Sequence, residues 1–398
     1  MKKIIATSWH PGGANAIIPV IKRLQKEEGV EMTIIGHEVS EGTFSKAGID
    51  YQVIKDHGIE DVSINSMTKL IEKIHPELIL TGSSVQDKDT KDVIEQTLTL
   101  AATGREIKSL SVLDWYGNLW ERFSNLYDEK GNFRTEFYGM SPARGYTEKH
   151  GRFKFLPSKI AIMDELAERV MIDEGFDRSR LVITGNPFFD ELVTLKEEFK
   201  DREKVRMDLG ITQRSFMIFY ASQPLEFTFG DKLGYDEKTV LRELLRAVQN
   251  IPRQEISVLV KVHPREDERN LENVVKEEEF RNLSIVIDKG YETRPALMAS
   301  DLVVSASSTV LIESSYLGLP SISLQPGLKA EDYLEMTNKS GITIPVYIKG
   351  EIKGILERIM FDDNYRTELA IKRSGFKIDG KATERVTNLV YEMLDRSN

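Results

Sequence analysis

Residues 301–320 read Asp-Leu-Val-Val-Ser-Ala-Ser-Ser-Thr-Val-Leu-Ile-Glu-Ser-Ser-Tyr-Leu-Gly-Leu-Pro, and this stretch decides the expected fold. The apolar run at 302–304 predicts a short strand, and the pattern at 310–316 predicts a helix that ends at Gly-Leu-Pro. Hydroxyl side chains fill the turn between the two. A strand that passes through a short polar turn into a helix is typical of α/β proteins.

The turn between this strand and helix is suited to a phosphate group. The first amides of a helix lack internal partners and the helix dipole is positive there, which stabilises an anion by ~0.3–1 kcal/mol. Ser307, Ser308 and Thr309 add hydroxyl donors. Glu313 lies one turn further on the same face, where its carboxylate is placed to accept hydrogen bonds from a ribose. Ser and Thr at such a position also fit an ordinary helix cap, which is their more frequent role.

A second motif upstream, Val-Leu-Val-Lys-Val-His-Pro-Arg-Glu at 258–266, favours the phosphate interpretation. Lys261, His263 and Arg265 place three potential cationic donors at the end of an apolar strand, where open α/β sheets bind ligands. Pro264 keeps His263 out of the helical region and therefore at the strand tip. A lone histidine after a strand is usually structural. Because a serine-rich turn follows in an acidic chain, we predict that these residues contact a diphosphate.

Four motifs carry a resemblance to a known superfamily: Val-His-Pro at 262–264, Ser-Ala-Ser-Ser-Thr at 305–309 with Glu313, Thr-Gly-Asn-Pro-Phe-Phe-Asp at 184–190, and Gly-Lys-Ala-Thr-Glu-Arg at 380–385. The superfamily comprises the GT-B glycosyltransferases and the UDP-N-acetylglucosamine 2-epimerases. The first two motifs resemble those of bacterial capsule and sialic-acid-type transferases and of CDP-glycerol glycerophosphotransferases. The third is similar to a segment that closes the first domain in the epimerases, and the fourth to the final helix of polymer transferases. None is specific to one reaction.

The resemblance implies an α/β GT-B fold, with two Rossmann-like domains that face each other across a cleft. The length of 398 residues agrees, because such a chain is too long for one ordinary core and suits two domains of about 150–200 residues. Alternating strand and helix patterns predict mostly parallel sheets. We expect an acceptor domain at 1–195, a nucleotide-donor domain at 207–380, and a helix at 381–398 that packs back toward the first domain.

The composition excludes several classes of function. The 64 acidic and 54 basic side chains give a net charge of −10, which argues against nonspecific nucleic-acid binding. The chain has no cysteine, so disulfides and thiolate metal sites are excluded. No run of about 20 apolar residues and no signal peptide is recognisable, so we expect a cytoplasmic protein. Neither a Gly-x-Gly-x-x-Gly fingerprint nor a P-loop is present.

The segment Ser-Trp-His-Pro-Gly-Gly-Ala-Asn at 8–15 follows the first predicted strand. Gly12 and Gly13 stand where this turn joins a helix, and we expect their missing side chains to let the backbone approach a ligand. The turn is therefore a candidate loop of the site.

Two residues of the first domain are candidates for the general base. His10 has an ordinary pKa of about 6.5, which suits proton transfer, although a hydrogen bond within its own loop is an equally good interpretation. Asp114 is the competitor. It opens the aromatic segment 114–123, which is suited either to the wall of a sugar or acceptor pocket or to a domain interface.

The resemblance places further residues near the nucleotide sugar. Ser222 stands in the turn after the first strand of the second domain, where such folds offer a phosphate-facing loop. Tyr291 and Thr293 are expected to stack on and hydrogen-bond the base. Glu331 and Asp332 are expected to face donor-sugar hydroxyls. The polar and aromatic region 133–155 is expected to form a long acceptor-facing loop or hairpin.

The function favoured by these motifs is transfer of a sugar or similar group from a UDP-, CMP- or CDP-type donor to a glycan or lipid-linked hydroxyl acceptor, in surface polysaccharide or glycolipid synthesis. We expect a metal-independent reaction without a cofactor, in which amides and side chains stabilise the leaving diphosphate. Two alternatives stay open: a 2-epimerase-type enzyme, although its Gly-Thr-Arg-Pro-Glu-like opening is missing, and a noncatalytic nucleotide-sugar-binding protein. Peripheral membrane contact and oligomeric state are left open as well.

Overall fold

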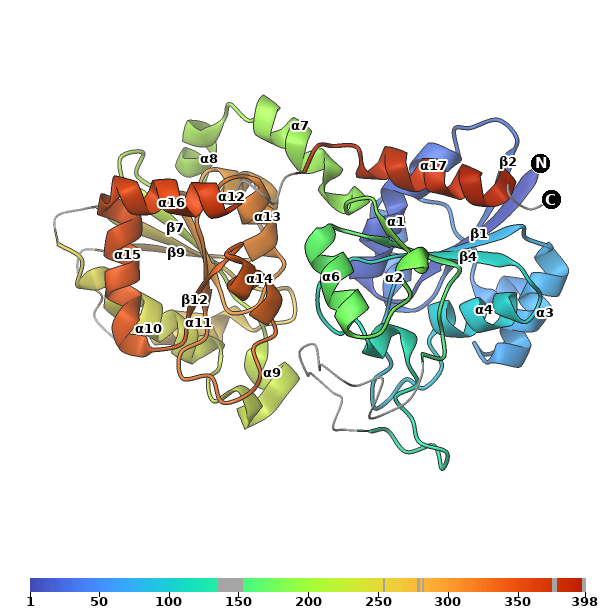
Figure 1. Cartoon of the computed structure of the whole chain (residues 1–398). Coiled ribbons are helices and arrows are strands. Elements are labelled where there is room, and N and C mark those ends of the chain that lie inside the picture. Colours follow the sequence, from blue (N-terminus) through green and yellow to red (C-terminus); the bar gives the residue numbers. More distant parts are fainter. Residues whose placement is uncertain (135–152, 253–254, 278–279, 281–282, 374–377, 396–398) are drawn as a thin grey trace. The chain divides into compact units, whose positions relative to one another are not determined.

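The computed structural model of the chain describes residues 1–134, 153–252, 255–277, 280, 283–373 and 378–395 (Figure 1). The chain forms two compact units. Unit 1 consists of Met1–Glu191 together with Asp379–Asn398, and unit 2 consists of Leu192–Ile378. Most of the predicted loop at 133–155 lies outside the described residues.

Unit 1 is built on a parallel sheet of six strands in the described residues, in the order β2-β1-β3-β4-β5-β6. The strands are β1 (Lys2–Ser8), β2 (Val30–Gly36), β3 (Leu78–Thr81), β4 (Lys108–Val112), β5 (Lys159–Ile162) and β6 (Leu181–Ile183). The main helices are α1 (Pro11–Leu24), α2 (Val39–Lys46), α3 (Ile64–Ile74), α4 (Ile94–Thr103), α6 (Glu165–Asp173) and α17 (Ala382–Asp395). Helix α7 (Asp190–Glu198) spans the boundary with unit 2.

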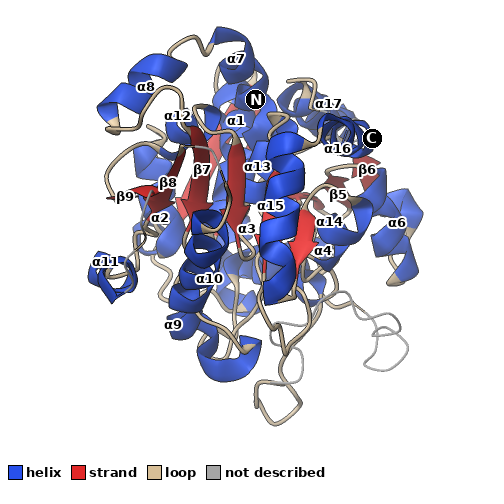
Figure 2. Cartoon of the chain, turned by 90° about the vertical axis from the view of Figure 1, so that its left-hand side faces the viewer, coloured by secondary structure: helices blue, strands red, loops and turns tan. Residues whose placement is uncertain are grey.

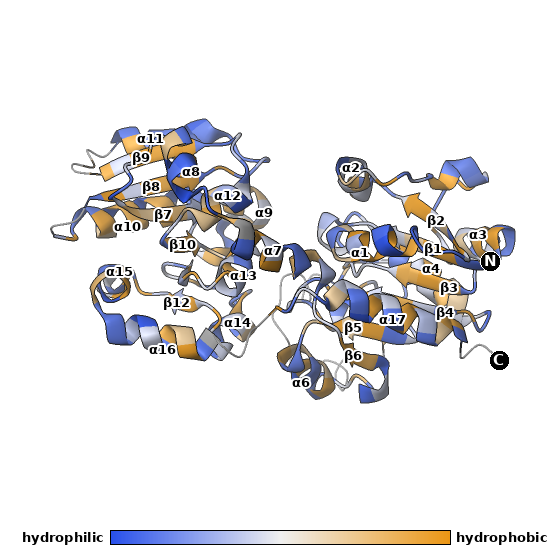
Figure 3. Ribbon diagram, turned by 90° about the horizontal axis from the view of Figure 1, so that it is seen from above, coloured by the Kyte–Doolittle hydropathy of each residue, from blue (hydrophilic) through white to orange (hydrophobic). Residues whose placement is uncertain are grey.

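The sheet of unit 1 is buried on both faces, because its strands are apolar at successive positions. Successive side chains of a strand point to opposite faces. Ile4 and Ala6 pack in a cluster with residues of α1 and α17, whereas Ile5 packs in another cluster with residues of α3 and α4. Figure 3 shows β1 and β3 in the colour of apolar residues. Continuous apolar strands of this kind are typical of parallel sheets covered by helices on both faces.

Unit 2 repeats the architecture with the strand order β12-β11-β10-β7-β8-β9, again all parallel. The strands are β7 (Phe216–Ala221), β8 (Ile256–Lys261), β9 (Leu283–Asp288), β10 (Leu302–Ser305), β11 (Ser321–Leu324) and β12 (Ile344–Val346). The helices are α8 (Arg202–Asp208), α9 (Leu225–Phe229), α10 (Glu237–Gln249), α11 (Glu268–Glu277), α12 (Thr293–Met298), α13 (Val310–Tyr316), α14 (Glu335–Ser340), α15 (Ile352–Phe361) and α16 (Asp363–Arg373). Figure 2 shows these strands between helices.

The strand order of unit 2 brings distant motifs to one edge of the sheet. Strand β7 pairs with β10 on one side and with β8 on the other, so Ala221 lies beside Lys261 and Tyr220 beside Val304. The segments that leave the carboxyl ends of these three strands are therefore neighbours. In doubly wound sheets this is the edge where ligands bind.

The predicted α/β fold with two Rossmann-like sheets is confirmed. The strand expected at 302–304 is β10, and the helix expected at 310–316 coincides with α13. Within the part of the chain that the structure describes, no helix is long and apolar enough to cross a membrane.

Candidate functional site

A pocket of about 270 Å³ opens in unit 2 at the carboxyl ends of β7 and β8. Small-molecule sites usually measure about 300–1,000 Å³, so this volume suits part of a nucleotide. Six of the residues predicted from the sequence line this pocket: Ser222, Lys261, His263, Tyr291, Thr293 and Ser308. The structure thus brings together side chains from four separate segments of the chain.

His263 is held in a defined tautomer. Its Nδ1 accepts a hydrogen bond from the backbone N–H of Arg265 at 3.1 Å. A neutral imidazole then carries its proton on Nε2, which becomes a donor. Burial, followed by the charges of Arg265 and Lys289, lowers the pKa of His263. The ring therefore acts as a neutral N–H donor at physiological pH, in the wall of the pocket.

Glu266 anchors the His-Pro segment and was missed by the sequence analysis. This buried carboxylate accepts a hydrogen bond from the backbone N–H of His263 at 2.9 Å and one from the Ser222 hydroxyl at 2.7 Å. Burial raises the pKa of Glu266 above its ordinary value. The hydroxyl of Ser222 is thus engaged with Glu266. The sequence signal was present, since an acidic residue three positions after a turn-forming residue often accepts its backbone N–H.

The cationic side chains near the pocket differ in whether other protein groups already bind them. Lys261 pairs with Asp288 at 2.8 Å and also donates to the backbone oxygen of Tyr291. Its predicted contact with a diphosphate would compete with this ion pair. Arg265 is exposed and does not belong to the described pocket lining. Lys289, which was not predicted, lines the pocket and donates to the backbone oxygen of Glu266 at 2.8 Å.

Gln223 supports the serine turn through hydrogen bonds and was not predicted from the sequence. The Gln223 side-chain oxygen accepts a hydrogen bond from the Ser307 amide at 2.7 Å. The amide of Val310 donates to the Ser308 hydroxyl at 3.3 Å. Thr309 is exposed and, like Ser307, lies outside the pocket lining. The Ser307 amide is consequently occupied by protein, and Ser308 is the residue of this turn that reaches the pocket.

Of the acidic residues predicted for the site in unit 2, Glu313 and Asp332 have protein partners and Glu331 is exposed. Glu313 is buried and pairs with Arg294 at 3.2 Å; burial raises the pKa of Glu313, against the effect of Arg294. Asp332 is buried and accepts four hydrogen bonds, from Gln325, Leu334, Asn338 and Tyr347. Its carboxylate therefore holds a loop together instead of presenting free oxygens to a sugar. Glu331 is exposed.

Unit 1 contains a second group of polar residues at the carboxyl edge of its sheet. Asp114 Oδ1 accepts hydrogen bonds from Arg122 Nη1 at 2.6 Å and from the Ser83 hydroxyl at 3.2 Å. A Cβ atom on Gly12 would lie 2.2 Å from Asp114 Oδ2, and one on Gly13 would lie 2.6 Å from the Ser8 hydroxyl. Protein atoms thus take the space beside both glycines, which the sequence analysis had expected to be open to a ligand.

His10 is exposed at the tip of the turn after β1 and contacts Trp9, with the ring centroids 4.2 Å apart. Its backbone N–H donates to the Ser84 hydroxyl at 3.3 Å. Desolvation lowers the pKa of His10, whereas Glu95 and Asp114 raise it. The net effect is a pKa of His10 below its ordinary value.

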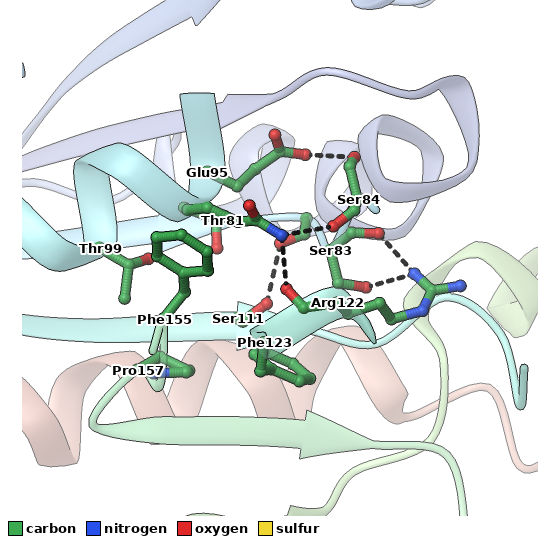
Figure 4. A pocket seen from close by; sticks show the side chains of 12 residues that line it. Thr81, Ser83, Ser84, Glu95, Thr99, Ser111, Arg122, Phe123, Phe155 and Pro157 are labelled. Atoms are coloured by element: carbon green, nitrogen blue, oxygen red, sulfur yellow. Dashed lines mark hydrogen bonds between the residues drawn. The ribbon is translucent and has the colours of Figure 1, made fainter. Parts of the chain in front are cut away.

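Glu95 is the centre of hydrogen bonding in unit 1, and it too was missed. One oxygen, Oε1, accepts from the Ser8 hydroxyl at 3.1 Å, the Trp9 amide at 2.9 Å and the Ser84 hydroxyl at 2.6 Å. Figure 4 shows the bond to Ser84. No group of three or more potential metal ligands occurs among the described residues.

The chain was compared with protein-family models, with curated proteins and with solved structures. The model of the family described as UDP-N-acetylglucosamine 2-epimerase matches residues 158–391, more than half of the chain. No curated protein matches the chain.

Solved structures show the same fold at low sequence identity. UDP-GlcNAc 2-epimerase from Neisseria meningitidis, bound to UDP-GlcNAc, is 14% identical, with a TM-score of 0.63 and coverage of 98% of this chain and 100% of that one. The 2-epimerase of Methanocaldococcus jannaschii is 17% identical, with a TM-score of 0.61 and the same coverage. MurG of Acinetobacter baumannii is 12% identical, with a TM-score of 0.60 and again the same coverage.

The prediction of a glycosyltransferase is wrong. The matching family is the one stated as the alternative, and the sequence motifs compared with transferases did not distinguish the two. The physical reason is that these motifs describe how a nucleotide diphosphate is held, and both reactions expel the same leaving group.

Proposed function

Because the chain belongs to the UDP-N-acetylglucosamine 2-epimerase family, we propose that it acts on a UDP-activated N-acetylhexosamine and inverts the configuration at C2 of the sugar. The proposal replaces transfer to an acceptor by a reaction within one substrate. No glycan or lipid-linked acceptor is then required.

Inversion at C2 requires the C2–H bond to break and to form again on the other face. This hydrogen is not acidic in the sugar itself, so its loss is coupled to departure of UDP from C1. The C2 proton passes to a base, the C1–O electron pair leaves with UDP, and a C1–C2 double bond forms. Re-addition of UDP at C1, with protonation of the opposite face of C2, restores the nucleotide sugar.

The observation that carries the proposal is the pocket of unit 2. His263 lines it as an Nε2–H donor, and Lys289 brings a positive charge to the same wall. A diphosphate gains negative charge as the C1–O bond breaks, so fixed donors in this pocket stabilise the transition state. The family match covers all of the segments that form the pocket.

The base is proposed to come from unit 1, where His10 and Asp114 are the candidates. Both oxygens of Asp114 are confined, Oδ1 by Arg122 and Ser83 and Oδ2 by the backbone at Gly12. His10 is exposed, and the charges of Glu95 and Asp114 favour its protonated form. We therefore assign the proton transfer to His10. If neither group takes up the proton, the second candidate function is a nucleotide-sugar-binding protein without turnover.

The deciding experiment incubates the purified chain with UDP-N-acetylglucosamine in deuterated water and follows the sugar signals by NMR. Turnover predicts the C2 epimer and exchange of the C2 hydrogen for deuterium, because the proton passes through a base in contact with solvent. His10→Gln is expected to lose this exchange while calorimetry still detects UDP binding.

A matched pair of lysine variants separates binding from chemistry. Lys289→Ala is expected to weaken UDP binding, whereas Lys276→Ala, on the exposed face of α11 with Glu272 as its partner, is expected to leave it unchanged. UDP binding without epimer and without exchange in the wild type would favour the binding protein. Absence of both binding and turnover would refute the proposed function.

A further inference from the structure

A small cavity lies in unit 1 between the turn after β3, helix α4 and Arg122 (Figure 4). Its volume is about 10 Å³, which is enough for the centre of one water molecule. The wall is polar on the side of the β3 turn, where Ser83 and Ser84 lie, and apolar on the side of Phe123 and Phe155. A polar cavity of this size is suited to a buried water rather than to an organic ligand.

Two side chains in the wall carry buried oxygens without a partner. Glu95 and Gln96 are each 3% exposed. Within the described residues, neither Glu95 Oε2 nor Gln96 Oε1 accepts a hydrogen bond. Both side chains line the cavity. Unpaired buried acceptors are disfavoured, most strongly when they belong to a charged group, so the arrangement calls for a donor that the protein does not supply.

The remaining atoms of the two side chains are fixed by protein groups. Glu95 Oε1 accepts three hydrogen bonds, from the last residue of β1 and from the turns that follow β1 and β3. Gln96 Nε2 donates to the backbone oxygens of Arg122 at 2.9 Å and of Ser84 at 3.4 Å. Because both of these partners are acceptors, the amide nitrogen cannot exchange places with the oxygen. Turning the Gln96 amide over is therefore not a way to provide a donor for the free oxygens.

We propose that this cavity holds one water molecule, which donates its two hydrogens to Glu95 Oε2 and Gln96 Oε1 and thereby keeps Glu95 in the orientation that positions the turn bearing His10. A water has two donors, as the two free acceptors require. Glu95 reaches the turn through the Ser8 hydroxyl and the Trp9 amide, next to His10. Glu95 is thus a positioning residue, and the water is its second support.

Two substitutions at Thr99 test the water without touching the residues it bonds. Thr99 lines the cavity from the next turn of α4 and is buried. Thr99→Val keeps the shape of the side chain, and Thr99→Ile adds one methyl group that is expected to occupy the cavity. High-resolution crystal structures are expected to show a water about 2.5–3.0 Å from both oxygens in the wild type and in Thr99→Val. The water is expected to be lost in Thr99→Ile.

The effect on the turn is measured by hydrogen exchange at the Trp9 amide in protein labelled at its three tryptophans. Loss of the bond to Glu95 is expected to speed exchange about tenfold in Thr99→Ile, with no change in Thr99→Val. The amides of Trp115 and Trp120 report whether the fold as a whole is disturbed.

Each result bears on the proposal independently of the proposed reaction. A dry cavity in the wild type, or density with the many short oxygen contacts of a metal ion, would overturn the water site. A water lost from Thr99→Ile with unchanged exchange at Trp9 would overturn the positioning role. If Thr99→Ile does not fold, the wild-type density alone decides the proposal, because a dry cavity overturns both the water site and its positioning role.

Discussion

Replacement of His263 provides a sharp test of the pocket in unit 2, because the structure fixes which atom is available for binding. Nδ1 is occupied by the Arg265 amide, so only Nε2–H can donate to a ligand. A hydrogen bond to a charged group contributes about 1.5–3 kcal/mol, and each 1.4 kcal/mol is a factor of ten. His263→Ala is therefore expected to raise the dissociation constant of UDP by about 10- to 150-fold.

The assay is calorimetric titration with UDP and, as the matched ligand, uridine. Uridine lacks the phosphates, so its affinity is expected to be the same in the wild type and in His263→Ala. His263→Gln places an amide N–H close to the position of Nε2 and is expected to retain most of the UDP affinity. Equal losses for uridine and UDP would mean that the substitution deforms the pocket. Unchanged UDP binding would refute the assignment of Nε2–H to the diphosphate.

Three further predictions concern stability. Gly12→Ala places a Cβ 2.2 Å from Asp114 Oδ2, so we expect the free energy of unfolding to fall by about 1–3 kcal/mol in urea titrations. The control is Gly42→Ala in α2, where a Cβ meets nothing within 4 Å, so this substitution should be neutral or stabilising. Asp190 accepts the Ala382 and Thr383 amides at the start of α17, so Asp190→Ala is expected to cost about 0.5–2 kcal/mol and Asp190→Asn less; equal costs would contradict a capping role. Burial, followed by Glu121, raises the pKa of Glu174 from 4.5 to about 8, so the unfolded chain releases this proton first and stability is lost as pH rises from 4.5 toward 8. Glu174→Gln should therefore raise the melting temperature more at pH 8 than at pH 5, and an equal gain at both would contradict the raised pKa.

The interpretation of single motifs depended on partners that the sequence does not reveal. Lys261, His263 and Arg265 are equivalent in the sequence, as three basic residues at a strand end. In the structure Lys261 is paired with Asp288, Arg265 is exposed, and His263 keeps a donor in the pocket wall. These differences arise from β9 and from the turn after β8, which local spacing does not place. The partners of Glu313 and Asp332 were likewise not recognisable from the sequence, because Arg294 and Tyr347 belong to other elements.

The sequence by itself determined the strands, the helices and the class of fold. Short apolar runs joined by polar turns to helices can bury their side chains only in parallel sheets covered on both faces, and this information is local. Only the tertiary structure decided which polar groups meet, because Glu266 with Ser222, Gln223 with Ser307 and Glu95 with the β1 turn are far apart in the chain. Their pairing follows from strand order, which sets the neighbours at the carboxyl edge of a sheet. The chemistry of the site depends on those neighbours, so the sequence revealed the residue types and the fold revealed which of them remain available to a ligand.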